Sequence, residues 1–193
     1  MFMKNSKLFI LLAVVLVLAG AAFFMFSGGK QKPMVSLEAF LDKTEYQAGE
    51  AIELTLHLNN TGGVDTCVSD IAAGSISFAS ITRDGEPVET RSVPANYIAS
   101  FPKLLEASLE TIGPGEDLHV TLPSENDPGL GARALATTAL ENDTGIVTFY
   151  NVEEPGEYAL ELVYRYVGPA SSDCPSVFEG PSNTANVIFT VPQ

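Results

Sequence analysis

Alternation of apolar and polar residues recurs along most of this 193-residue chain. Residues 52–58, for example, read Ile-Glu-Leu-Thr-Leu-His-Leu, so every second side chain is apolar. A period of two places the apolar side chains on one face of an extended strand, whereas a helix requires a period of 3.6. The segments with this pattern are residues 35–41, 52–58, 76–81, 118–122, 158–166 and 187–191. Residues 146–152 form a more continuously apolar strand.

Turn signals separate these predicted strands. Asp84-Gly85 predicts a two-residue hairpin, and Pro87 restricts the returning strand to the edge of a sheet. Because each strand buries one face only, two sheets must cover each other. The sequence therefore predicts an all-β fold, an antiparallel immunoglobulin-like β-sandwich of seven or eight strands. Tyr158 follows the Pro155-Gly156 turn into its strand, and we expect its hydroxyl to bond to nearby backbone as a corner tyrosine.

Two segments depart from the strand pattern. Residues 101–109 have the sequence Phe-Pro-Lys-Leu-Leu-Glu-Ala-Ser-Leu, and residues 128–141 are rich in Ala and Leu. Both compositions favour helix, and each segment has a proline near its start. We expect short helical insertions between strands at both places.

The N-terminal region contains an uncharged apolar run of 19 residues, 8–26. As a helix it would be about 28 Å long, close to the hydrocarbon thickness of about 30 Å. Either the run is an uncleaved transmembrane anchor, or it is a cleavable signal with Ala19-Gly20-Ala21 at the cleavage site. The apolar residues 23–26 favour the anchor. Ala21 stands where a lipoprotein signal needs its cysteine, which excludes that class.

Export of the C-terminal part follows from the usual role of short N-terminal apolar segments. Basic residues are balanced on the two sides of the run, so charge does not set the orientation. We expect a cytoplasmic start at residues 1–7, a tether at 27–34 and the extracytoplasmic sandwich at 35–193. The protein would then be a single-pass protein of the cell membrane, or a secreted one if the signal is cleaved.

Acidic residues dominate the part beyond the tether. Six of the ten basic residues lie there, against all 24 acidic ones, for a formal charge of −18. Such a surface is well solvated and repels nucleic acid and anionic lipid. We therefore expect no nucleic-acid partner.

The chain has two cysteines, Cys67 and Cys174. Outside the cell, two thiols in one domain most simply form one disulfide, here closing a loop of roughly 107 residues. Two separate buried thiols are the alternative. A cysteine metal site is disfavoured because neither residue has a Cys or His at ligand spacing.

Metal and catalytic patterns are weak. His57 and His119 fall on the polar side of predicted strands, and they would share a metal ion with a carboxylate only if those strands are neighbours. The acidic turns at 125–127 and 141–145 offer oxygens to calcium without the EF-hand spacing. No nucleophile–base spacing occurs. We therefore assign no catalytic, cofactor or metal residue and expect no enzyme activity.

Several turn and strand motifs follow one another in a familiar order. They are YQAGE at 46–50, LTLHLNNTG at 54–62, ITRDGEPV at 81–88, IGPGE at 112–116, PGEY at 155–158 and SN at 182–183. The order resembles bacterial immunoglobulin-like extracellular domains, in particular the sandwich that precedes the catalytic domain of deuterolysin-type metalloproteases. It is also similar to the small sandwich of intracellular-type bacterial proteinase inhibitors. No HExxH motif occurs in the chain, so the resemblance implies a fold and not a protease.

The expected function is that of a membrane-tethered extracytoplasmic domain that binds or supports another, unidentified protein. Residues 87–91 and the two insertions are the predicted contact surfaces, since loops and sheet edges usually make such contacts. The alternatives are a protease inhibitor with a sandwich fold, or a weak calcium- or zinc-binding domain.

Overall fold

The computed structural model describes residues 34–95 and 100–193. They belong to one compact unit, Pro33–Gln193. The predicted membrane segment at 8–26 lies outside the described residues. Among residues 34–95 and 100–193, no helix is both long and apolar enough to cross a membrane.

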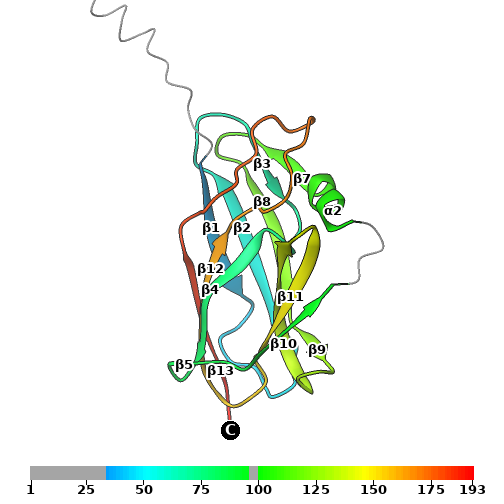
Figure 1. The fold of residues 1–193 in the computed structure, drawn as a ribbon. Coiled ribbons are helices and arrows are strands. Elements are labelled where there is room, and N and C mark those ends of the chain that lie inside the picture. The colour runs from blue at the N-terminus through cyan, green and yellow to red at the C-terminus, as the bar shows by residue number, and fades with distance from the viewer. Residues whose placement is uncertain (1–33, 96–99) are drawn as a thin grey trace, which may run out of the picture. The chain divides into compact units, whose positions relative to one another are not determined.

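Antiparallel β-structure dominates the described residues, which confirms the all-β prediction (Figure 1). Thirteen strands and one helix are present among them, so the expected seven or eight strands were too few. The strands are β1 (Val35–Leu41), β2 (Glu53–Asn60), β3 (Thr66–Ser69), β4 (Ile76–Arg83), β5 (Glu86–Pro87), β6 (Thr90–Pro94), β7 (Leu109–Ile112), β8 (Asp117–Pro123), β9 (Glu125–Asp127), β10 (Ala132–Glu141), β11 (Thr144–Asn151), β12 (Gly156–Tyr164) and β13 (Ala185–Val191).

Four sheets organise these strands. The first has the order β1-β2-β8, the second β13-β12-β4-β5 and the third β6-β11-β10-β9, and the fourth is the two-stranded sheet β3-β7. Asp84-Gly85 makes the predicted hairpin between β4 and β5, because Arg83 pairs directly with Glu86. As Pro87 indicated, β5 stands at the edge of its sheet.

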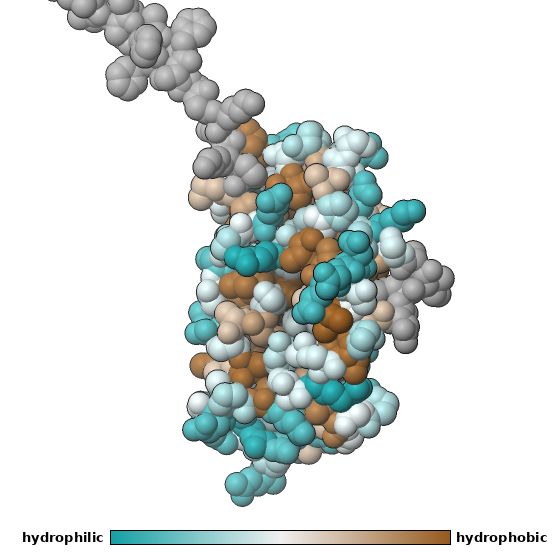
Figure 2. Space-filling model, in the orientation of Figure 1, coloured by the Kyte–Doolittle hydropathy of each residue, from teal (hydrophilic) through white to brown (hydrophobic). Residues whose placement is uncertain are grey.

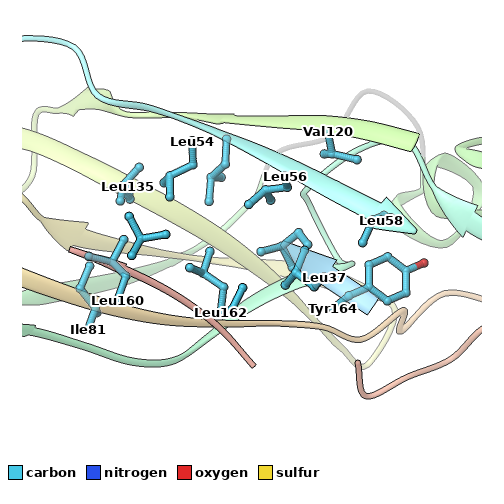
Figure 3. Close-up of a cluster of buried hydrophobic side chains, with 14 of the residues drawn as sticks. Leu37, Leu54, Leu56, Leu58, Ile81, Val120, Leu135, Leu160, Leu162 and Tyr164 are labelled. Atoms are coloured by element: carbon cyan, nitrogen blue, oxygen red, sulfur yellow. The ribbon is translucent and has the colours of Figure 1, made fainter. Parts of the chain in front are cut away.

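The first two sheets contribute side chains to one hydrophobic core. Along β2, Leu54, Leu56 and Leu58 are buried, and the residues between them are partly exposed. Leu160 and Leu162 of β12 are buried in the same cluster. Figure 3 shows the β2 leucines on one side of this cluster and the β12 leucines on the other. The alternation in sequence thus predicted which side chains enter the core.

The predicted helix at 101–109 is present in shorter form as α2 (Phe101–Ala107). Pro102 lies in its first turn, where a missing backbone N–H costs nothing. Phe101 and Leu105 are buried and attach the helix to the core. The helix stops before Leu109 because that residue begins β7 and pairs with Ser69 of β3.

The helical prediction for residues 128–141 is wrong. Residues 132–141 form β10, which pairs with β9 on one side and β11 on the other. The hairpin from β10 to β11 turns at Asn142 and Asp143, whose φ values of 47° and 64° are both positive. Asn and Asp tolerate this region, as a two-residue type I′ turn requires. Pairing on both edges therefore outweighs the helix preference of Ala and Leu.

Tyr158 makes the predicted corner contact at the start of β12. The Tyr158 hydroxyl donates a hydrogen bond to the backbone oxygen of Glu154, at 2.7 Å. We expect Tyr158→Phe to lower the free energy of unfolding by about 1 kcal/mol, the usual net contribution of one hydrogen bond, because the Glu154 carbonyl loses its donor. Chemical denaturation measures the change. Tyr150→Phe is the matched control, since no hydrogen bond to the Tyr150 hydroxyl exists within the described residues; equal losses in both variants would rule out a specific role for the corner bond.

The predicted disulfide between Cys67 and Cys174 is present. Cys67 lies in β3, and the two Cα atoms are 6.2 Å apart. Backbone bonds support the same junction, since Cys67 N–H donates to Ser176 O and Phe178 N–H donates to Cys67 O. The bridge thereby fixes the segment between β12 and β13 against β3.

Candidate functional site

The outer face of the β1-β2-β8 sheet holds the most distinctive group of polar side chains. His57 on β2 and His119 on β8 are directly paired in register. Asp117 lies two residues before His119, so both project from the same face of β8. The two histidines were expected to meet only if their strands are neighbours, and β2 and β8 are adjacent in this sheet.

The side chains of these residues converge on one carboxylate oxygen. Asp117 Oδ2 lies 2.6 Å from His119 Nε2 and 3.7 Å from His57 Nδ1. The two imidazole rings stack with their centroids 3.8 Å apart and an angle of 21° between their planes. One ligand atom from each of the three residues lies within 4.8 Å of the other two.

The surroundings of the cluster leave it open to solvent on one side. The side chains of His57, Asp117 and His119 are 32%, 45% and 57% exposed. The ring of Phe40, on β1, contacts the His57 ring at a centroid distance of 4.9 Å. Glu38 pairs with His57 in register from the β1 side, which puts a further carboxylate on the same face.

Asp117 is the residue of this cluster that the sequence analysis missed. An Asp-x-His pattern within a strand places a carboxylate and an imidazole on one face, and that signal was available at 117–119. Its contact with His57 could not be predicted, because the two residues are 60 positions apart and meet only through the pairing of β2 with β8.

The acidic turn predicted at 125–127 is a strand, β9, and the carboxylate of Asp127 already has partners. Arg91 Nε donates to Asp127 Oδ2 at 2.8 Å, and a second Arg91 nitrogen donates to Oδ1 at 2.5 Å. The backbone N–H groups of Gly129 and Leu130 donate to the same carboxylate. With this set of donors, Asp127 is a structural ion-pair partner and a poor calcium ligand.

The ion pair between Arg91 and Asp127 predicts acid-sensitive stability. The hydrogen bond from Arg91, with those from Gly129 and Leu130, lowers the pKa of Asp127 to about 2 against the opposing effect of burial. A lowered pKa stabilises the fold above the unfolded-state pKa of about 4, and this contribution disappears as pH falls through about 2. Thermal melts at several pH values should therefore show Asp127→Asn less stable than the parent at pH 7, with the gap closing in acid. A constant gap across this range would contradict the assignment.

Comparison with protein families and with curated proteins identifies no relative. No protein-family model matches the chain, and no curated protein matches it significantly. Function must therefore be inferred from the residues of this chain.

Proposed function

We propose that this protein is a membrane-tethered extracytoplasmic domain that binds or supports another protein and has no catalytic activity. The observation that carries the proposal is the disulfide between Cys67 and Cys174. Stable disulfides belong to oxidising compartments outside the cytosol. The apolar run at 8–26 is of the length that an anchor or export signal needs, so both features favour the same location.

We further propose that the described part is an immunoglobulin-like β-sandwich. In such folds one sheet contains strands A, B and E, and the other contains G, F and C with an added C′. The orders β1-β2-β8 and β13-β12-β4-β5 follow this scheme in both sheets. The bond from Tyr158 to Glu154 at the start of β12 corresponds to the tyrosine corner of that fold. The remaining strands, among them β10 and β11, are additions to it.

Sheet edges near residues 86–94 support a role in protein binding. β5 is the last strand of one sheet and β6 is the last strand of another, so this short segment supplies two edges. Exposed edge backbone is a usual acceptor for an added strand. On the face drawn in Figure 2, apolar side chains form separate groups among polar ones, and hydrophilic side chains gather at the end that holds the C-terminus. A mixed surface of this kind suits a reversible contact.

Two measurements on the producing cell test this proposal. The full chain should sediment with membranes after an alkaline carbonate wash, and protease added to intact cells or spheroplasts should digest the β-rich domain. A soluble chain that survives external protease would overturn the placement.

Crosslinked membranes then test the binding role. Pull-down of the full chain should enrich a protein that is absent when residues 1–34 carry an unrelated domain instead. If both baits return the same proteins, the domain recruits no partner and the binding role is refuted.

A further inference from the structure

We propose that His57, Asp117 and His119 form a binding site for one divalent transition-metal ion of the zinc, copper or nickel kind. The inference goes beyond the proposed function and does not depend on where the protein is located. It rests on the convergence of two imidazole nitrogens and one carboxylate oxygen from adjacent strands.

The backbone fixes this convergence. The direct register of His57 with His119 holds their Cα atoms at cross-strand distance, and Asp117 follows on the same face of β8. Because β2 is the central strand of its sheet, the position of His57 is set by pairing on both sides. The site is therefore built on strands and not on loops, which favours a defined geometry.

The distances between the three ligand atoms are close to those of a zinc site, and a small movement of the side chains would complete the coordination. Zinc binds imidazole nitrogen and carboxylate oxygen at about 2.0–2.2 Å, so tetrahedral ligand atoms lie about 3.4 Å apart. The three ligand atoms here lie within 4.8 Å of one another. Imidazole lone pairs lie in the ring plane, so one ring must also turn out of the stack. The His119 side chain is 57% exposed, so its ring can turn in this way without displacing the core.

The chemistry of the donors selects the ion. Imidazole suits zinc, copper and nickel, whereas calcium and magnesium require oxygen ligands. Three protein ligands leave at least one position for water or for a group from another molecule. Glu38, opposite His57 in register, is a further carboxylate on the same face. Without an ion, His119 and Asp117 simply share a hydrogen bond.

Isothermal titration of the purified full chain in detergent with zinc chloride tests the proposal. We expect one ion per chain with a dissociation constant of about 10 μM or tighter. His57→Ala, His119→Ala and Asp117→Asn should each weaken binding at least about 10-fold, since removal of even an outer-shell partner costs that much. Asp65→Asn, an exposed carboxylate between β2 and β3, is the matched control and should bind as the parent does.

Three further measurements remove alternative explanations. Melting temperatures of the variants show whether weaker binding reflects loss of the fold, and variants that melt with the parent retain it. Calcium chloride should not displace zinc. The imidazole proton resonances of both histidines should shift together on zinc addition. Absence of zinc binding, or equal binding by His57→Ala, His119→Ala and Asp65→Asn, would overturn the proposed site.

Discussion

Replacement of both Cys67 and Cys174 by serine should lower the free energy of unfolding by about 4–5 kcal/mol. The bridge joins residues that are 107 positions apart, and a loop of that size restricts the unfolded chain strongly. For a domain of this size the loss corresponds to a fall in melting temperature of roughly 10–15 °C. The native state should also loosen between β12 and β13, because the bridge holds this segment against β3.

Chemical denaturation of the parent, the reduced parent and the double-serine variant measures this effect. The reduced parent is the control, because it lacks the bridge but retains both sulfur atoms. It should unfold at the same denaturant concentration as the variant. A loss below about 1 kcal/mol in both would show that the bridge contributes little.

Leu162→Ala should lower the free energy of unfolding by about 2–5 kcal/mol, the range for deletion of a buried leucine side chain. Leu162 lies on β12 and is fully buried. Leu56 on β2 is equally buried in the same cluster, and Leu56→Ala should cost a similar amount. Leu104→Ala on α2 is the control, since Leu104 is 37% exposed and its removal should cost far less.

The double variant of Leu56 and Leu162 tests whether the two sheets share one core. When two residues pack against the same neighbours, the loss of stability in the double variant usually differs from the sum of the two single losses by about 0.5 kcal/mol or more. Additive losses, or a small loss for either leucine alone, would contradict the common core drawn in Figure 3.

Long, regular strands were predictable from the chain because burial of one face imposes a period of two. β2 and β12 follow that rule along their length, and Tyr158 could be assigned to a corner from the turn before it. Short strands carry no such signal. β3 has four residues and is buried on both faces, so its sequence does not alternate.

The histidine cluster and β10 could not be predicted from local sequence, because both depend on pairing between strands. The histidine cluster depends on the register of β2 with β8, and the contact of Arg91 with Asp127 joins residues on β6 and β9. Neither is encoded by local spacing. In β10, local composition even favoured the wrong structure, because Ala and Leu prefer helix while pairing with β9 and β11 decides the outcome.

The redox state of Cys67 and Cys174 in the producing cell tests the account most directly. Cells are lysed directly into denaturant that contains a large maleimide reagent, and a parallel sample is reduced before the reagent is added. An exported, bridged domain should take up the reagent only after reduction, and the full-length chain should be found in the membrane fraction. Modification of both thiols without reduction, on a chain recovered from the cytosol, would contradict the account.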